Sequence, residues 1–315
     1  MWGDVDVVAE YAALRQAAGV VDGRHQMVIA EGRDAVRFLD DLLSQEVAGL
    51  PVGAVARSLL LGPQGKLRAL LWLLRGEERV AMVADAGVAQ TVLDDLTQYM
   101  IRVKLSLWLD ERPMVDLIGP ASEEVLARAG LDPPPGWSDE QGTLVARAPL
   151  GDLPRFLVAG EGVARLEAAG AIVAGSLAWR AIRVEAGEPV MGVDVDERTI
   201  PQEGGLVEHS VSFTKGCYLG QELVARIDSR GHVNRLLRGV VIEVNVLPPD
   251  GAGVWVEDRQ VGAVTSVAES LTVRAPVALG LLRREVAPGD RVEVRWDGGS
   301  APARVSELPL VPNGG

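Results

Sequence analysis

The sequence contains a single cysteine, Cys217, in 315 residues. No intramolecular disulfide can form, so we expect a protein of the reducing cytoplasm. Iron–sulfur clusters usually take four cysteine ligands, so the chain is not expected to hold one itself. Histidine is also scarce, and none of His25, His209 and His232 stands at metal-ligand spacing to Cys217. We therefore expect no zinc or other metal site.

Long apolar runs are absent as well. The longest run, at 67–74, is interrupted by Arg68 and is far shorter than the roughly 20 residues that cross a bilayer. The first ten residues carry three acidic side chains and no Lys or Arg, so they lack the basic start of a signal or transit peptide. We expect neither a membrane span nor a targeting segment, and a cytoplasmic location.

Positive charge is in short supply. The 31 Lys and Arg residues face 44 Asp and Glu residues, which gives a net charge of -13. Such a chain repels phosphate backbones, and no basic run offers a local exception, so direct nucleic-acid binding is not expected. The composition is 48% hydrophobic and 24% charged, which is typical of globular proteins, and the length predicts two or three packed units.

The N-terminal part of the chain alternates strand-like and helical segments. Asp34 can cap an amphipathic helix at 34–46, and two strand-like runs over 57–75 are joined by a Gly-Pro-Gln-Gly turn at 62–65. A strand at 79–84 and a helix at 86–100 follow. This order predicts an α+β layer with helices on one face of an antiparallel sheet.

The pattern partly recurs after a Pro-rich connector at 131–137, with strands at 143–148 and 155–159 and helices at 161–168 and 176–186. After about Asn234 the sequence pattern changes to short strand-like runs rich in β-branched residues, separated by Pro- and Gly-containing turns. We therefore predict an α+β region at 1–234, with two subdomains joined near 131–137, and a small all-β barrel or sandwich at 235–315.

The helix predicted at 176–186 carries one acid on its apolar face. At 100° per residue, Glu185 falls on the same side as three apolar residues of the helix and points inward. A buried carboxylate must be paired or richly hydrogen-bonded. Its partner is either a structural salt bridge or helix-end bond, or a ligand edge with two adjacent N–H donors, as in a pterin. Trp179, at the border of this face, is either a flat wall for such a ring or ordinary core packing.

The only thiol lies in the segment Lys-Gly-Cys-Tyr-Leu-Gly-Gln-Glu at 215–222, just before a helix predicted to run to about Ile227. A helix start and the neighbouring Lys215 would both favour the thiolate of Cys217, so a reactive thiol is one interpretation. The alternative is a small buried hydrophobic residue. A Cys–His catalytic pair would require the fold to bring the two residues together.

Four segments together resemble the YgfZ branch of the glycine-cleavage T-protein superfamily. They are Arg-Val-Glu-Ala-Gly at 183–187, Thr-Ile-Pro-Gln-Glu at 199–203, the segment at 215–222, and Val-Ala-Arg at 224–226. The segment at 215–222 is the most specific, and its other signature residues are Gly216, Tyr218, Gly220, Gln221 and Glu222.

This resemblance implies an α+β clover-leaf of two mixed units and a C-terminal β-barrel around a central channel that holds tetrahydrofolate or a one-carbon derivative. Glu185 would bind the pterin edge, and Trp179 and His25 would line the channel. Family members often carry an aromatic residue at the position of His25. Arg226 is the candidate for the folate tail carboxylates, and Arg57 is a second one.

One segment departs from the enzymes of the superfamily. Aminomethyltransferases carry an aspartate shortly after the glycine that corresponds to Gly65, whereas this chain has Arg68, Ala69 and Leu70. The acid–base carboxylate is missing, and such groups contribute typically 10²–10⁴-fold to rate. The resemblance therefore implies a folate-binding chain that is not a competent aminomethyltransferase.

The resemblance further implies an accessory protein that supports the assembly or repair of iron–sulfur proteins and, through them, tRNA modification. Its partners would be folate and iron–sulfur proteins or their assembly factors, with Cys217 and Lys215 as candidates for chemistry. Two alternatives remain open at this point. One is a tetrahydrofolate-dependent aminomethyltransferase or demethylase, and the other is a purely structural interaction module.

Overall fold

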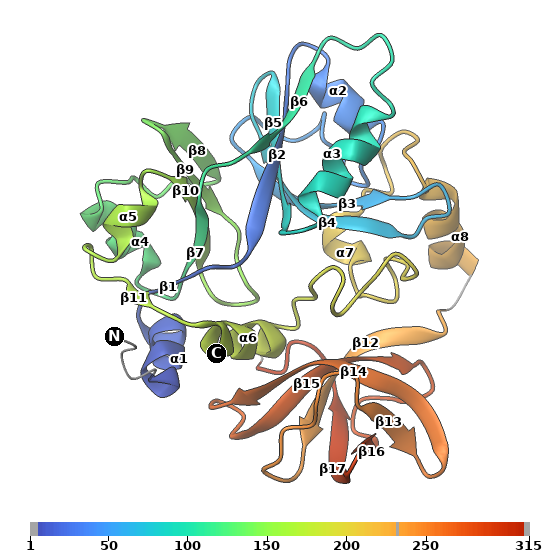
Figure 1. The fold of residues 1–315 in the computed structure, drawn as a ribbon. Helices are drawn as coiled ribbons and strands as arrows, with labels where there is room; N and C mark the ends of the chain where they lie inside the picture. Colours follow the sequence, from blue (N-terminus) through green and yellow to red (C-terminus); the bar gives the residue numbers. More distant parts are fainter. Residues whose placement is uncertain (1–5, 231–232, 312–315) are drawn as a thin grey trace.

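The computed structural model describes residues 6–230 and 233–311, and it shows two α+β units and a β-barrel (Figure 1). The first unit is built on a five-stranded antiparallel sheet. Its strands, in spatial order, are β3 (Val55–Leu61), β4 (Leu67–Arg75), β5 (Arg79–Asp85), β2 (His25–Glu31) and β6 (Ser106–Asp110). The predicted hairpin is confirmed, because β3 and β4 pair across the turn at 62–65.

Two helices, α2 (Ala35–Asp40) and α3 (Ala89–Thr97), cover one face of this sheet and bury an apolar core against it. The helix predicted at 34–46 is wrong in length. Beyond Asp41 the chain leaves the helix and joins the sheet, where the Ser44 amide donates to the Leu59 carbonyl at 3.1 Å and Leu43 pairs with Leu60. Backbone hydrogen bonds to β3 therefore replace the helical bonds that the apolar periodicity favoured.

The second unit is built on a six-stranded sheet. Its strands, in spatial order, are β11 (Ile172–Val173), β1 (Gly19–Val21), β7 (Met114–Ile118), β10 (Arg155–Gly160), β9 (Thr143–Arg147) and β8 (Trp137–Glu140). The short helices α4 (Ser122–Arg128) and α5 (Val163–Leu166) pack on it. Residues 131–137 lie inside this unit, between α4 and β8, and the chain instead passes from the first sheet to the second between β6 and β7.

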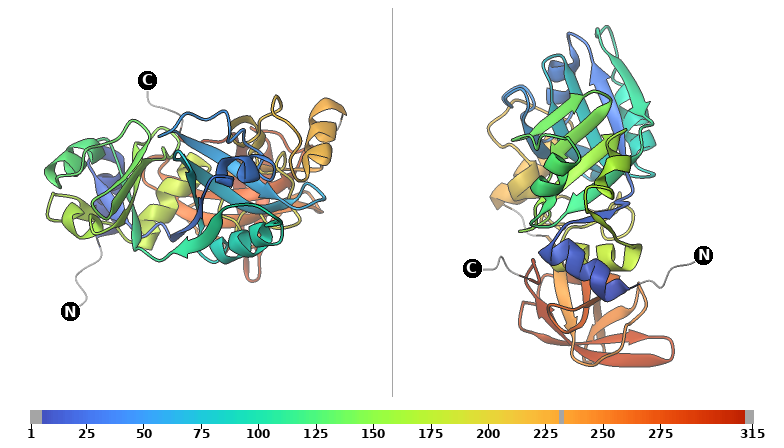
Figure 2. Two further views of the ribbon diagram at one scale, coloured as in Figure 1. Left: turned by 90° about the horizontal axis from the view of Figure 1, so that it is seen from above. Right: turned by 90° about the vertical axis from the view of Figure 1, so that its left-hand side faces the viewer.

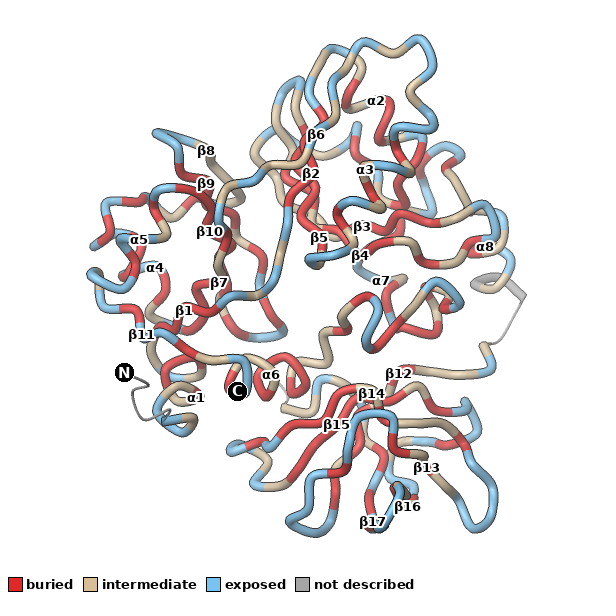
Figure 3. Tube along the Cα trace, viewed as in Figure 1, coloured by how far each residue is buried: buried red, intermediate tan, exposed pale blue. Residues whose placement is uncertain are grey.

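The two sheets share a core. Met27, Ile29 and Val83 of the first sheet belong to one buried cluster with Leu144 and Leu157 of the second. Because helices cover the outer faces, the two units form a helix–sheet–sheet–helix stack, which runs from left to right in Figure 1. In the right-hand view of Figure 2 the second unit lies in front of the first. Figure 3 shows the buried residues concentrated along these strands.

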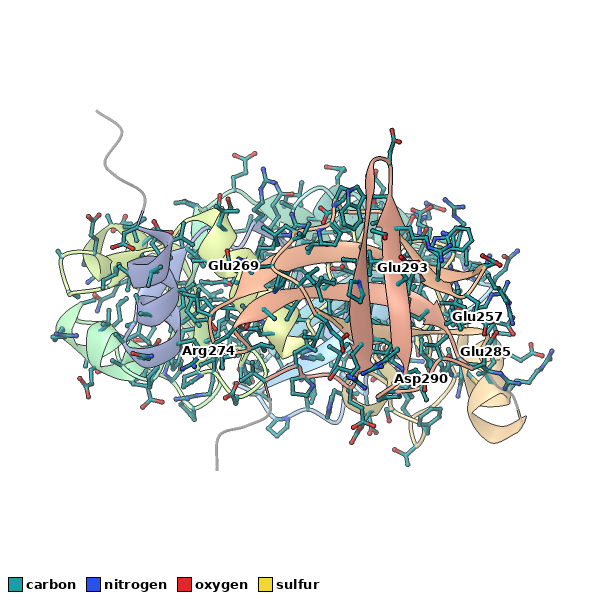
Figure 4. The ribbon with its side chains drawn as sticks, turned by 90° about the horizontal axis from the view of Figure 1, so that it is seen from below. Glu257, Glu269, Arg274, Glu285, Asp290 and Glu293 are labelled. Carbon is teal, nitrogen blue, oxygen red and sulfur yellow. The ribbon has the colours of Figure 1, made fainter. Side chains whose placement is uncertain are left out.

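The C-terminal region is a closed barrel of six antiparallel strands. They are, in spatial order, β12 (Arg235–Ile242), β15 (Ala275–Arg283), β14 (Arg259–Ser270), β13 (Gly253–Val256), β16 (Arg291–Trp296) and β17 (Gly299–Ser306). Closure leaves no free strand edge and encloses an apolar core. Its outer surface carries acidic side chains, among which Figure 4 labels Glu257, Glu269, Glu285, Asp290 and Glu293.

Two helices join the second unit to the barrel. The helix predicted at 176–186 is confirmed as α6 (Ser176–Ala186), and α1 (Val7–Gln16) packs beside it. Both contribute to one core with β12, β14 and β15 (Figure 1). The remaining helices are α7 (Val207–Ser210) and α8 (Gln221–Arg230). None of the helices in the described part of the chain is long and apolar enough to cross a bilayer.

Candidate functional site

A hollow of about 970 Å³ lies where the two α+β units and the C-terminal segment meet. Strands β3 and β4 supply Arg57 and Trp72, and the second unit supplies Trp137 and Arg147. The end of α6, the loop at 204–206, His209 of α7 and Leu308 after the barrel complete the walls. Ligand sites of small molecules typically have volumes of about 300–1,000 Å³, so the hollow is large enough for one.

A smaller inner cavity of about 50 Å³ adjoins the hollow. The residues that line both spaces are Arg57, Trp72, Glu188, Pro189 and Leu206. His25, Leu70 and Asp85 line only the inner cavity. A ligand in the hollow can therefore direct one end toward a small polar recess.

Trp72 stands at the boundary of the two spaces. It alternates along β4 with Leu71 and Leu73, which belong to the core under α2 and α3, so its ring is left partly exposed. The guanidinium carbon of Arg57 lies 4.6 Å from the centre of the Trp72 ring, within the distance of a cation–π contact. The hollow thus has the Trp72 ring as a flat aromatic wall, in contact with the Arg57 guanidinium.

Glu188 lies immediately beyond the end of α6 and connects the two units. Its carboxylate accepts from Arg57 Nη2 at 2.7 Å and from Arg155 Nη1 at 2.9 Å. Burial alone would raise the pKa of Glu188, but the charges of Arg155 and Arg57 outweigh burial and hold this pKa below its ordinary value. The site therefore contains a carboxylate that stays ionised between two guanidinium groups.

His25 begins β2 and lies between two carboxylates. Its Nε2 is 3.3 Å from Asp116 Oδ2, and its Nδ1 is 3.9 Å from Asp85 Oδ1. Burial would lower the pKa of His25, but the charge of Asp116 outweighs burial and raises it. Burial raises the pKa of Asp85, although His25 and the Met191 amide, which donates to Asp85 Oδ2 at 2.9 Å, counteract this. His25 thus lines the inner cavity, and its contact with a ligand stays a prediction.

Glu185 points inward as expected, but the structure does not bring it to the hollow. It is fully buried between α6, α1 and the barrel. Tyr11 donates to Oε1 at 2.6 Å, Arg15 donates to Oε2 at 2.7 Å, and Ser270 also donates to Oε1. Both oxygens are thus used by the protein, which is the structural salt bridge that we considered as one alternative.

Trp179 is also placed away from the hollow. It packs against the core shared by α1, α6 and the barrel, so core packing accounts for it. Arg226 lies exposed on α8, where it donates to Glu222 at 2.6 Å, whereas the hollow is lined by other elements. Of the predicted ligand residues, Arg57 and His25 are the ones that line the two spaces.

The side-chain amine of Lys215 is bonded to carbonyl groups at and just after the end of α2, and not to the thiol. Its buried Nζ donates to the carbonyls of Asp40, Leu43 and Gln45. Burial lowers the pKa of Lys215, although Asp40 opposes this shift. Cys217 is exposed, and α8 begins only at Gln221. The amine that was expected to act on the thiol is therefore bonded to these carbonyl groups, and the helix begins four residues after Cys217.

The remaining signature residues hold the loop at 215–222 against the first unit. Gly220 has φ 80°, and a Cβ there would lie 2.6 Å from the Gly62 carbonyl oxygen in the β3–β4 turn. Burial raises the pKa of Tyr218 to about 12, and Gln221 Oε1 accepts from the Tyr218 amide at 3.3 Å. Gly216 has open space around it. The loop is anchored by packing, which leaves Cys217 at its exposed side.

Strand β4 carries no carboxylate toward the cavity. Ala69 is fully buried in the core, and Leu70 lines the inner cavity. Arg68 is engaged with Asp95 at 2.7 Å and Glu197 at 2.6 Å. Two acids do line the inner cavity, namely Glu188 and, from the neighbouring strand, Asp85 at the end of β5.

Sequence reasoning missed Trp72, Asp85 and Glu188. Trp72 lies within the predicted strand region 57–75, where the alternation of sides along a strand could have marked it as facing away from the core under the helices. Asp85 directly follows the strand predicted at 79–84. Glu188 follows Gly187, whose left-handed φ of 73° ends α6, so a helix-end signal was present. His232 lies outside the described residues, and no group of His, Cys, Asp and Glu within the described part of the chain could hold a metal ion.

Comparison with known proteins agrees with this architecture. Residues 4–132 match the GCVT N-terminal domain, and residues 235–312 match the glycine cleavage T-protein C-terminal barrel domain. The crystal structure of the glycine cleavage system aminomethyltransferase T from Bartonella henselae superposes with a TM-score of 0.89 at 25% identity, covering 98% of this chain and 90% of that one.

Curated relatives include an aminomethyltransferase of Thermus thermophilus, which is 29% identical and aligns with 97% of this chain and 90% of its own length. An uncharacterized protein of Haemophilus influenzae is 26% identical over 217 residues, which are 68% of this chain and 70% of that protein. The chain thus carries both domains of the glycine-cleavage T-protein family and is a distant homologue of the aminomethyltransferases.

Proposed function

We propose that the protein binds tetrahydrofolate or a one-carbon derivative in the central hollow. The observation that carries this proposal is the hollow of about 970 Å³ with Trp72 as a flat wall and a polar inner cavity at one end. A reduced folate has a flat, polar pterin at one end and carboxylates at the other. Membership of the family supports the same ligand.

The distribution of charge suggests an orientation for this ligand. The pterin packs against Trp72 with its polar edge directed into the inner cavity, where Asp85 supplies a carboxylate acceptor. Asp85 takes the role first assigned to Glu185. The tail carboxylates point toward Arg147, which lines the outer hollow and is half-buried beside Glu123. Arg147 thereby replaces Arg226 as the candidate for the tail.

The same geometry favours an accessory protein over an enzyme. Strand β4 presents Leu70 to the inner cavity, while Arg68 is held by Asp95 and Glu197. The group that would act on the one-carbon unit is therefore lacking on this strand. We extend the proposal to a folate-dependent role in the assembly or repair of iron–sulfur proteins, and through them in tRNA modification, with those proteins or their assembly factors as partners.

The second candidate, an aminomethyltransferase, is favoured by the distant homology over nearly the whole chain. An assay of aminomethyl transfer with the other glycine-cleavage proteins and tetrahydrofolate separates the two. We expect turnover far below the roughly 1–10³ per second of typical enzymes, because β4 supplies no acid–base group. The Thermus thermophilus aminomethyltransferase is the positive control. A turnover in the enzyme range would refute the accessory role.

A further inference from the structure

Ionisable side chains are concentrated around the inner cavity. His25, Arg57, Asp85 and Glu188 line a space of only about 50 Å³. Asp116 and Arg155 stand directly behind them, and both side chains are fully buried. Burying this many charges is costly unless each is paired. The arrangement of the pairs therefore indicates which group is left for a ligand.

Four of these groups balance one another in charge. Arg57 and Arg155 each donate to Glu188, and Arg155 Nη1 is 3.5 Å from Asp116. These two positive and two negative charges cancel. The nearby Arg183 is likewise balanced, by Asp194 at 2.6 Å. His25 and Asp85 remain, with Nδ1 and Oδ1 3.9 Å apart, and one proton carried by either residue keeps the whole cluster neutral.

The side chains of this cluster differ in how far they are exposed to solvent. The Asp116 side chain is fully buried, and Gly23 covers it so closely that a Cβ there would lie 2.6 Å from Oδ1. The Asp85 side chain is 18% exposed and that of His25 is 9% exposed. Asp116 Oδ1 and Arg155 Nη2 have no hydrogen-bond partner among the residues that the structure describes. The cluster is therefore incompletely satisfied within the protein, and Asp85 is its most accessible carboxylate.

We infer that His25 and Asp85 form a proton-exchange site in the inner cavity, so that a ligand with a basic amine or ring nitrogen binds there with transfer of one proton. The inference rests on the proposed function for the identity of the ligand. It adds to that function a pair of residues that exchange a proton with the ligand. The pair comes from β2 and β5 and not from β4.

The step is a simple acid–base exchange. The proton that His25 or Asp85 carries leaves the pair, and the nitrogen lone pair of the ligand accepts it. The pair gains one negative charge and the ligand gains one positive charge, so the ion pair that results lies in the cavity next to Asp85. Burial raises the pKa of Asp85, so its ionised form is favoured by a positive charge placed beside it in the cavity.

Calorimetric titration with tetrahydrofolate, in buffers of different ionisation enthalpy at several pH values, measures the protons exchanged on binding. We expect a pH-dependent exchange in the wild-type protein that is lost in Asp85→Asn and altered in His25→Gln. The exposed Asp258→Asn is the matched control. 5-Formyltetrahydrofolate, whose N5 is an amide and not a base, should bind without this exchange. Unchanged exchange in Asp85→Asn would overturn the inference.

A second measurement needs no ligand. The chain has three histidines, so the imidazole signals can be followed by NMR and His25 can be assigned with His25→Gln. The titration midpoint of His25 should fall in Asp85→Asn, because one of its two facing carboxylates is removed, whereas an unchanged midpoint would overturn the pair. If tetrahydrofolate does not bind at all, the proposed function fails and this titration alone decides whether the pair exists.

Discussion

Replacing Glu185 by Gln should destabilise the protein strongly and leave folate binding nearly unchanged. The carboxylate is fully buried and pairs with Arg15 at 2.7 Å, while Tyr11 and Ser270 donate to its other oxygen. Removing one partner of a buried ion pair costs about 3–5 kcal/mol, because the other charge stays buried. The thermal midpoint should therefore fall on the order of 6–20 °C, taking roughly 2–4 °C per kcal/mol.

Glu222→Gln is the matched control for this substitution. Glu222 also pairs with an arginine, Arg226 at 2.6 Å, but both side chains are exposed, and such pairs contribute about 0–1 kcal/mol. Thermal unfolding and tetrahydrofolate affinity should be measured on both variants. An unchanged midpoint together with affinity at least about tenfold weaker, which corresponds to 1.4 kcal/mol, would return Glu185 to the role of pterin acceptor.

Replacing Trp72 by Ala should weaken tetrahydrofolate binding by about tenfold to a hundredfold. Trp72 lines both the hollow and the inner cavity, and stacking of a flat ring on an aromatic side chain contributes about 1–3 kcal/mol. Trp72→Phe keeps an aromatic face and should recover part of the loss. Equilibrium dialysis gives the affinities.

Two further results decide what this loss means. Trp296→Phe changes a tryptophan packed against the barrel core and should leave the affinity as it is. Because Arg57 and Arg155 lie 4.6 and 5.7 Å from the Trp72 ring, thermal unfolding must show that Trp72→Ala is folded. A folded Trp72→Ala with wild-type affinity would rule out the aromatic wall as the binding surface.

The sequence predicts local elements better than it predicts the partners of buried groups. Helix 176–186 and the hairpin over 57–75 follow from capping, periodicity and turn residues, all of which are local. Periodicity also shows that Glu185 faces inward. It cannot show what Glu185 meets there, since Tyr11 lies 174 residues away in the sequence and Ser270 lies 85 residues away.

The errors in the candidate site have the same origin. The helix predicted at 34–46 ends early because Leu43 and Ser44 bond to β3, a segment that local periodicity does not include. Lys215 is close to Cys217 in sequence, but its amine donates to carbonyl groups just after the end of α2, about 170 residues earlier. Asp85 and His25 become neighbours only because β2 and β5 pair in register at these two residues. Sheet pairing and long-range hydrogen bonds thus decide which polar residues form the site.

The most direct test of folate binding in the hollow is an equilibrium titration of the protein with tetrahydrofolate, followed by tryptophan fluorescence. Trp72 and Trp137 both line the hollow, so a ligand there should quench their emission with saturation at one molecule per chain. The quench should shrink when Trp72 is replaced by Phe. The absence of saturable binding at millimolar tetrahydrofolate, about -4 kcal/mol at most, or an identical quench in the Trp72→Phe protein, would contradict binding at this site.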